Sequence, residues 1–512
     1  MKIKRLHIKS AGNFKLLYGF DQSFYSNNNE YLQPLCLVGV NGSGKSQLLE
    51  VLAEIFYALD ARYNNFQDKR FETDILFEIE YLIKNNGNQK HIYISRLQKG
   101  LPKVYLISSD KKTEIKNSNE ISEILPTKII GYTSGENETL SIPYKDLYDN
   151  YADYVSRLAL NPESVKYSEV PDSRLLFLDY NTNISIFVSN FLLRQDSDLK
   201  IFSRTINVQQ LRSFRIIIQL NHQAAPGSNG IELTRELEDY IENLKKCATC
   251  YNFENDARIY TFDYYVNDAT KSAFKYFFKN AFKLYTALYK IKLLNNLMIR
   301  KKDLQNIKKL RKEHKLVLKP PTVPETDKVF RFENVKLKIK SSNDPVDYVS
   351  LSDGEHQFIQ IFGSLMMIDD DGILFLMDEP ESHFNPKWRS LFMTVLNELK
   401  KKKEQCIFVT SHSPFILSDF HSETVYIFKL TNKGIKIEHP QEETYGASFD
   451  RLLKIAFDIS PPLAYKSLKE IRTLQKSKNK KNIAKKIPRF GDSIEKFYLY
   501  QRIEELSEQE KK

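Results

Sequence analysis

The chain has 512 residues, of which 41% are hydrophobic and 28% charged, and its formal net charge is +11. This composition can bury one large core or two moderate ones, which excludes an intrinsically disordered chain. We find no apolar run of about eighteen residues and no secretion signal, so we expect no membrane span. Because 512 residues contain only 4 cysteines, we expect a reducing, cytoplasmic compartment.

The strongest motif lies near the N-terminus. The apolar run 35–38 leads into Gly-x-x-x-x-Gly-Lys-Ser at residues 39–46, a phosphate-binding loop. Its glycines let backbone N–H groups converge on phosphate, and the following helix adds partial positive charge. Lys45 is expected to reach the β- and γ-phosphates of ATP, and Ser46 to ligate Mg²⁺. The residues expected to bind ATP are Gly39, Asn41, Gly42, Ser43, Gly44, Lys45 and Ser46.

The next elements are predicted strands. Residues 74–108 alternate apolar and polar side chains around an Asn-Gly turn, which predicts an antiparallel meander. A further strand at 129–133 runs into a polar loop with glycine at 134–138, which is either structural or nucleotide-sensing. We assign residues 1–146 to the N-terminal half of an ATPase core.

Helical periodicity follows and predicts an inserted helical domain at residues 147–318. The candidate helices are 187–193, 231–246 and 273–315. Within this domain, Cys247 and Cys250 form a C-x-x-C pair without further ligands at metal-binding spacing, so we interpret it as incidental.

The proline-rich segment 319–324 predicts a linker back to the core, and a strand is expected at 330–339. We assign residues 319–460 to the C-terminal half of the core, and 461–512 to a basic helical extension. Residues 494–503 have helical spacing of apolar and aromatic side chains, which favours core packing over a docking helix.

Acidic and polar motifs complete the predicted site. The buried-strand run 373–377 ends in Asp378 and Glu379. Phosphoryl transfer needs positioning and charge neutralisation, so Asp378 is expected to hold Mg²⁺ and Glu379 to polarise the attacking water. Leu-Ser-Asp-Gly-Glu lies upstream at 351–355, and His412 ends a strand downstream, where we expect a catalytic contact with the γ-phosphate.

In this order the motifs resemble those of the ATP-binding-cassette (ABC) superfamily. The resemblance implies an α/β fold: a split ABC-type, RecF- and Rad50-like P-loop ATPase head with an antiparallel β-subdomain and an inserted helical domain. It also implies binding of ATP in trans: the nucleotide held by the phosphate-binding loop of one chain is contacted by the signature of a second chain. The signature residues are Ser352, Gly354 and Glu355, and the protein is therefore expected to be at least a dimer. Phe384 and Asn385 stand where transporters have Leu-Asp, and the glutamine lid cannot be assigned among Gln67, Gln89 and Gln98.

The block Ser411-His412-Ser413-Pro414 resembles soluble repair and defence ATPases, and the whole pattern is similar to the PtuA family of Septu antiphage systems and its retron-associated relatives. That resemblance implies a partner HNH nuclease, PtuB, and in retrons also a reverse transcriptase with its multicopy single-stranded DNA. The chain itself shows no nuclease site. Two alternatives stay open: a repair-type ATPase acting on DNA ends, and a sensor scaffold that nucleotide merely holds together.

Positive charge is concentrated in two segments. Residues 283–319 carry 12 basic and 2 acidic side chains, and residues 466–489 carry 10 basic and 1 acidic, while the whole chain is only +11. Such clusters suggest a nucleic-acid partner, although a solvated helix face is the alternative. The candidate contacts are Lys301, Lys302, Lys308, Lys309, Arg311, Lys312, Lys478, Lys480, Lys481, Lys485 and Lys486.

Overall fold

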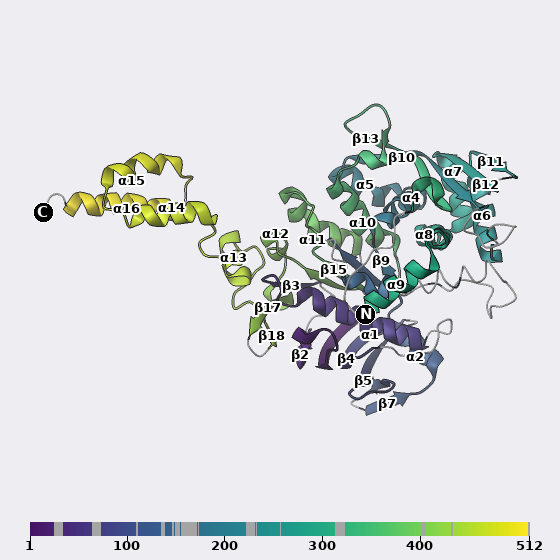
Figure 1. The fold of residues 1–512 in the computed structure, drawn as a ribbon, viewed down its shortest axis with the longest axis horizontal. Coiled ribbons are helices and arrows are strands. Elements are labelled where there is room, and N and C mark those ends of the chain that lie inside the picture. Colours follow the sequence, from purple (N-terminus) through teal and green to yellow (C-terminus); the bar gives the residue numbers. More distant parts are fainter. Residues whose placement is uncertain are drawn as a thin grey trace. The chain divides into compact units, whose positions relative to one another are not determined.

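The computed structural model describes residues 1–24, 34–63, 73–85, 87–108, 111–134, 139–145, 148, 154, 172, 174–221, 231, 233–256, 258–312, 323–400, 405–431 and 434–509. The chain forms two compact units, unit 1 (Met1–Tyr445) and unit 2 (Gly446–Lys512) (Figure 1). The described part of unit 1 contains three sheets and their helices, whereas the described part of unit 2 is helical. Among these residues, no helix is both long and apolar enough to cross a membrane.

The central sheet of unit 1 has the strand order β18-β17-β3-β16-β15-β8-β9. All neighbouring strands are parallel except β17 and β18. β3, β15 and β16 are buried almost throughout, as expected for parallel strands covered on both faces. The strands are β3 (Leu35–Gly39), β8 (Ile129–Thr133), β9 (Leu175–Phe177), β15 (Ile373–Asp378), β16 (Gln405–Thr410), β17 (Val425–Thr431) and β18 (Gly434–Glu438).

Helix α1 follows the phosphate-binding loop and contacts β3, β8, β15 and β16. Helix α10, which begins at the signature, packs against α4 and α11. α4 also packs against α7 and α8, so it joins the inserted segment to the core. The α-helices of unit 1 with complete bounds are α1 (Lys45–Tyr63), α2 (Ser118–Ile124), α4 (Asn183–Leu193), α5 (Asp196–Thr205), α6 (Arg235–Cys247), α7 (Asp268–Phe278), α8 (Ala281–Lys292), α9 (Lys301–Lys312), α10 (Asp353–Met367), α11 (Pro386–Lys400) and α12 (Pro414–Leu417).

Short 3-10 helices link several of these elements. They are η1 (Lys15–Leu17), η2 (Thr139–Ser141), η4 (Tyr180–Thr182), η5 (Leu293–Met298), η6 (Glu325–Asp327), η7 (Tyr348–Ser350), η8 (Ser422–Thr424) and, in unit 2, η9 (Ile487–Arg489).

The second sheet is antiparallel, with the order β2-β1-β4-β5-β6-β7. Its consecutive hairpins from β4 to β7 confirm the meander predicted from alternation. The alternate residues Phe77, Ile79 and Tyr81 are buried, which is why the period of two was visible in the sequence. The strands are β1 (Lys2–Ser10), β2 (Phe20–Ser23), β4 (Leu76–Asn85), β5 (Asn88–Arg96), β6 (Lys103–Ser108) and β7 (Lys111–Ile115).

A third, five-stranded antiparallel sheet corrects the expected helical domain at 147–318. Its order is β11-β12-β10-β13-β14, and β10 to β12 fall inside that segment, which also supplies β9 to the central sheet. The long strand β10 pairs with β13, the strand predicted at 330–339. The β10–β13 pairing spans so long an interval that it leaves no local pattern. β11 and β12 form a local hairpin, but β11 is exposed throughout and so shows no alternation. The strands are β10 (Val208–Gln219), β11 (Cys250–Glu254), β12 (Ile259–Tyr265), β13 (Phe330–Ile339) and β14 (Val346–Asp347).

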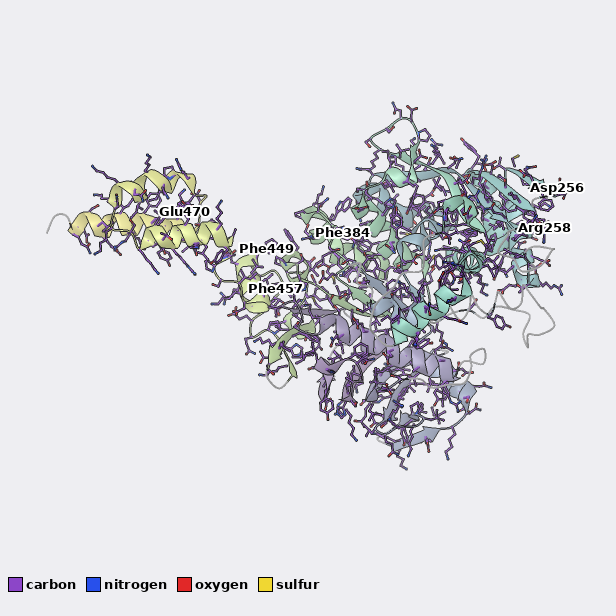
Figure 2. All side chains as sticks on the ribbon, in the orientation of Figure 1. Asp256, Arg258, Phe384, Phe449, Phe457 and Glu470 are labelled. Carbon is purple, nitrogen blue, oxygen red and sulfur yellow. The ribbon has the colours of Figure 1, made fainter. Side chains whose placement is uncertain are left out.

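Unit 2 consists of α13 (Phe449–Phe457), α14 (Tyr465–Gln475), α15 (Lys480–Lys486) and α16 (Ile494–Gln509) (Figure 2 labels Phe449, Phe457 and Glu470). α14 and α15 both pack against α16. Unit 2 begins at Gly446, so α13 falls in it and not in the core half expected to end at 460. The buried side chains of its core are Ile471, Leu474, Ile483, Ile487, Leu499 and Leu506.

Candidate functional site: a phosphate-binding loop beside paired carboxylates

The phosphate-binding loop has the backbone shape that its glycines predict. Gly39, Gly42 and Gly44 adopt φ values of +142°, +78° and +94°, which side-chain-bearing residues rarely adopt. A Cβ atom on Gly39 would lie 2.4 Å from the carbonyl oxygen of Phe428. The loop therefore turns tightly against β17 and opens into α1, whose first N–H groups have no partner within the helix.

Lys45 and Ser43 lie buried within this loop. The Nζ of Lys45 donates hydrogen bonds to the carbonyl oxygens of Gly39 (3.0 Å) and Val40 (3.2 Å). Burial lowers the pKa of Lys45, and the nearby carboxylates of Glu379 and Asp378 oppose that lowering. The Oγ of Ser43 is buried without a hydrogen-bond partner in the structure. An unpartnered donor beside an inward-facing lysine fits a triphosphate, which accepts hydrogen bonds from both.

Asp378 is the meeting point of three hydroxyl groups. Ser46 Oγ donates to Asp378 Oδ1 at 2.8 Å, and Thr410 Oγ1 donates to the same oxygen at 2.7 Å. Thr133 Oγ1 lies 3.3 Å from Asp378 Oδ2. Hydroxyl and carboxylate oxygens are the ligands that Mg²⁺ prefers, so Ser46 and Asp378 fit the metal predicted for them. Thr133 and Thr410 were not among the predicted site residues; their only signal in the sequence was that each ends a predicted strand.

Glu379 and His412 lie together beside this cluster. His412 Nε2 is 3.3 Å from Glu379 Oε1, and the hydrogen bond between them holds the pKa of Glu379 below its usual value. Thr410 Oγ1 accepts a hydrogen bond from the backbone N–H of Glu379 at 3.0 Å. Glu379 has φ +48°, a conformation that costs free energy and is concentrated at functional sites. An ionised, partly exposed carboxylate in this place suits a base that polarises water.

Strand order explains why these distant residues meet. β16 lies between β3 and β15, and β8 lies on the other side of β15. All four are parallel, so their carboxyl ends share one edge of the sheet. The loop follows β3, His412 follows β16, and the acidic pair ends β15. Ser46 and Asp378 thus bond across 332 positions of sequence.

The signature forms the capped start of α10. Ser352 and Glu355 make a capping box, with Ser352 N donating to Glu355 Oε2 at 2.8 Å and Glu355 N to Ser352 Oγ at 3.4 Å. Ser352 is exposed. A Cβ on Gly354 would lie 2.9 Å from the carbonyl oxygen of His383 and 3.1 Å from Trp388, so glycine allows close packing there. The exposed helix start is compatible with the predicted role in trans, which stays a prediction.

The loop after the acidic pair is anchored to α10. Phe384 is buried, and its ring centroid lies 6.1 Å from that of Phe358 and 6.2 Å from that of Phe362, both on α10 (Figure 2 labels Phe384). Asn385 Oδ1 accepts the backbone N–H of Trp388 at 2.9 Å and so caps α11. The departure from Leu-Asp therefore has a structural role: Phe384 fills an aromatic cluster, and Asn385 starts a helix.

A buried polar network lies under this loop. Gln357 of α10 donates to Tyr132 Oη at 2.6 Å and accepts the backbone N–H of His383 at 3.2 Å. The carboxyl group of Glu381 is hydrogen-bonded to Ser411 Oγ, and burial raises the pKa of Glu381 to about 7. These contacts connect the signature helix and the loop to the residue before His412. Gln357 and Glu381 were not predicted from the sequence, because neither is a phosphate-binding or catalytic position of the motifs.

The candidate nucleic-acid residues lie in two different units. On α9, Lys302 and Lys309 are exposed, and the side chains of Lys301, Lys308, Arg311 and Lys312 lie outside the described residues. In unit 2, Lys478, Lys481 and Lys485 are exposed, and Lys480 and Lys486 are half-buried. Lys486 pairs with Glu470 at 3.2 Å. Nucleic-acid contact by these residues therefore stays a prediction.

The cysteine pair and two of the three glutamine candidates lie in the part of the chain that the structure describes. Cys247 is buried at the end of α6, Cys250 is exposed at the start of β11, and both are free thiols. No cluster of three metal-ligating side chains occurs among the described residues. Gln89 and Gln98 are exposed, and Gln67 lies outside the described residues.

Residues 210–418 match the family model described as "AAA domain, putative AbiEii toxin, Type IV TA system". This segment of the chain is therefore similar to an AAA-type ATPase domain. The matched segment includes the signature, the acidic pair and His412, and it begins after the phosphate-binding loop. Together with the parallel sheet, the antiparallel sheet and the capped signature helix, this domain has the α/β fold expected for an ABC-type head.

Other similarities are partial or distant. "Protein ea59" of Escherichia phage lambda is 29% identical over 84 residues, so the match spans only 16% of this chain and 16% of that protein. The SMC head bound to the C-winged helix domain of ScpA aligns with 11% identity and a TM-score of 0.34, over 86% of this chain and 98% of that one. The SMC head domain from Thermotoga maritima aligns with 11% identity and a TM-score of 0.31, over 86% and 100%.

Proposed function

We propose that the protein binds and hydrolyses ATP with Mg²⁺, and that its nucleotide state controls a partner nuclease in antiphage defence. The observation that carries the ATPase part is the cluster at one sheet edge: Ser46 and Thr410 both donate to Asp378, beside Glu379 and buried Lys45. Phosphoryl transfer requires such side chains to converge at one point, whereas the packing of the fold does not.

Each residue has a distinct task in this proposal. Lys45 exchanges its bonds to the loop carbonyls for bonds to the β- and γ-phosphates, and Ser43 donates to a phosphate oxygen. Ser46 and Asp378 hold Mg²⁺, which neutralises charge that develops on the phosphates. Glu379, whose pKa is lowered further by its hydrogen bond with His412, orients water for attack on the γ-phosphate. His412 then faces the γ-phosphate from the end of β16.

The site takes its last contacts from a second chain. The start of α10 offers the exposed Ser352 at a helix N-terminus, whose partial positive charge favours an anion. In the ABC resemblance this terminus caps the γ-phosphate of the partner's nucleotide. The protein therefore acts as at least a dimer, with ATP at the shared interface.

The defence part rests on resemblance and on the comparisons. The motifs resemble PtuA-type ATPases, which implies an HNH nuclease partner and, in a retron setting, a reverse transcriptase with its multicopy single-stranded DNA. The matching family description names a toxin of a type IV TA system, and a phage protein shares a short similar segment. These names support a role in conflict between phage and host.

Two variants test the ATPase part. Lys45→Ala should abolish ATP binding, because it removes the only described lysine inside the loop. Glu379→Gln should bind ATP and lose about 100-fold or more of its turnover, the usual contribution of a positioned base. Glu398→Gln, which changes an exposed carboxylate on α11, is the matched control. Near-normal turnover in both site variants would refute the proposal.

Sizing the Glu379→Gln protein tests the dimer. ATP should shift it from a smaller to a larger species, and Ser352→Ala should weaken that shift. An assembly that forms without nucleotide and ignores ATP contradicts the shared site, and an ATP-held assembly whose wild type hydrolyses no ATP favours the sensor scaffold.

A pull-down from the native host tests the partner. The tagged protein should recover a small HNH protein, and a DNA–RNA hybrid with a reverse transcriptase indicates the retron setting. Absence of both, together with turnover that rises with linear duplex DNA, contradicts the defence hypothesis and favours a repair ATPase. Such stimulation should weaken steeply with salt, because phosphate contacts dominate nonspecific affinity.

A further inference from the structure

β11 is an exposed edge strand of the five-stranded sheet. Within the described residues it pairs only with β12, and all five of its residues are exposed. Tyr251 keeps 54% of its surface exposed and Phe253 keeps 37%. The outer side of such a strand presents unpaired N–H and C=O groups, which form a template for another strand.

The other edge strands that the structure describes are very short, carry lysine or hold a charge in an ion pair, whereas the only charged residue of β11 is Glu254. β9 and β14 contain only 3 and 2 residues. β7 and β18 carry lysines, and β2 holds Asp21 in an ion pair with Arg5. The sequence of β11 is Cys-Tyr-Asn-Phe-Glu, with no proline and no lysine. Short length, lysine and proline are the usual protections of an edge, so β11 is an open one.

The sequence of β11 is complementary to itself. Antiparallel pairing of two copies about Asn252 sets Tyr251 of each copy opposite Phe253 of the other, and Cys250 opposite Glu254. Aromatic cross-strand pairs stabilise antiparallel sheets, and no like charges face each other in this register. Phe253 already stacks on Tyr260 of β12, with ring centroids 4.3 Å apart. The pairing thus continues an existing row of aromatic rings into the second chain.

We propose that two copies of this chain join through their β11 strands, so that two five-stranded sheets become one continuous sheet. The occupant of the edge is a second copy, because the register about Asn252 sets the exposed rings of Tyr251 and Phe253 opposite each other at both ends of the pair. A twofold axis through Asn252 makes the same patch serve both chains, as closed dimers require.

This contact uses no nucleotide and lies on a different sheet from the ATP site. The β11–β12 turn, marked by Asp256 and Arg258 in Figure 2, lies at the periphery of unit 1, on the side that carries α6 and α7 (Figure 1). The two interfaces are therefore distinct. Two different twofold contacts on one chain build a tetramer or a longer array, so the assembly extends beyond the ATP-held dimer.

Disulfide trapping tests the pairing. Asn252→Cys is introduced with Cys250→Ser, since Cys36, Cys247 and Cys406 are buried. Directly opposed residues in an antiparallel pair have Cα atoms about 4.5 to 5.5 Å apart, within reach of a disulfide. Mild oxidation of the full chain without nucleotide should give a covalent homodimer on a non-reducing gel. The matched control is Tyr276→Cys in the same background, an exposed position on α7.

A second measurement avoids the engineered thiol. Phe253→Lys places two like charges near the twofold axis, at a position 37% exposed from which a lysine side chain can reach solvent. It should abolish nucleotide-free dimers in sedimentation equilibrium. Its ATP turnover should equal that of the wild type, which separates this inference from the ATPase proposal. Absence of a crosslink in the Asn252→Cys protein, or equal crosslinking by the Tyr276→Cys control, overturns the inference. Crosslinking in host cells to another protein also overturns it and assigns the edge to that partner.

Discussion

Replacing Glu381 by glutamine should change the pH dependence of stability. The carboxyl group is 3% exposed, its Oε2 is buried without a hydrogen-bond partner, and burial raises its pKa from 4.5 to about 7. The folded state therefore holds this proton more tightly than the unfolded state. The stabilisation is fully present below pH 4.5 and is lost as the pH rises through about 7.

The size of the effect follows from the two pKa values. Each pKa unit is worth about 1.4 kcal/mol, so the difference between about 7 and 4.5 sets an upper bound of roughly 3.5 kcal/mol. Glutamine cannot ionise, so the variant escapes this loss. At pH 8 the free energy of unfolding of Glu381→Gln, relative to wild type, should rise by up to about 3 kcal/mol compared with pH 5.

Urea unfolding at pH 5 and pH 8 measures this difference. Trp388 is the only tryptophan and lies on α11, so its fluorescence reports unit 1. Glu114→Gln, an exposed carboxylate on β7, is the matched control and should change stability little at either pH. If Glu381→Gln changes the free energy of unfolding equally at pH 5 and pH 8, or lowers it at pH 8, the buried carboxyl group is not held protonated.

Three further substitutions test the site. Gly39→Ala should destabilise the loop by about 1–3 kcal/mol and abolish ATP binding, because the added Cβ would lie 2.4 Å from Phe428 O and φ is +142°. Gly491→Ala, with open space around it, is the control and should leave the melting temperature in calorimetry unchanged. Thr410→Val removes the hydrogen bond that Thr410 donates to Asp378 and the one that it accepts from the backbone N–H of Glu379. It should lower kcat far more than it raises KM, and an unchanged kcat would contradict a role of Thr410 in catalysis. Ser352→Ala should cost about 1 kcal/mol in urea unfolding through loss of the capping box; a variant as stable as wild type would show that this cap adds nothing to stability.

Most of the site could be predicted from sequence because its motifs are contiguous. Residues 39–46 determine the loop, since glycines, lysine and serine must follow one another within one turn. The acidic pair and His412 follow apolar runs that are strands in the structure. Thr133 and Thr410 were not predicted, because a threonine at the end of a strand acquires its role only from the neighbouring strand.

The sheets also differ in how well the sequence predicted them. The meander of β4 to β7 was predicted because hairpins pair neighbours in sequence and bury alternate residues. The five-stranded sheet was not, because β10 pairs with β13 across more than one hundred positions and because β11, although part of a local hairpin, is exposed throughout and shows no alternation.

The sequence by itself determined the phosphate-binding loop, the paired carboxylates and the helices and strands with strong local periodicity. Tertiary structure alone decided that hydroxyl groups from α1, β8 and β16 meet at Asp378, that Glu381 is buried, and that β11 is left as an open edge. The physical reason is range: local patterns fix backbone conformation and chemistry, whereas burial and strand neighbours arise from contacts between residues far apart in the chain.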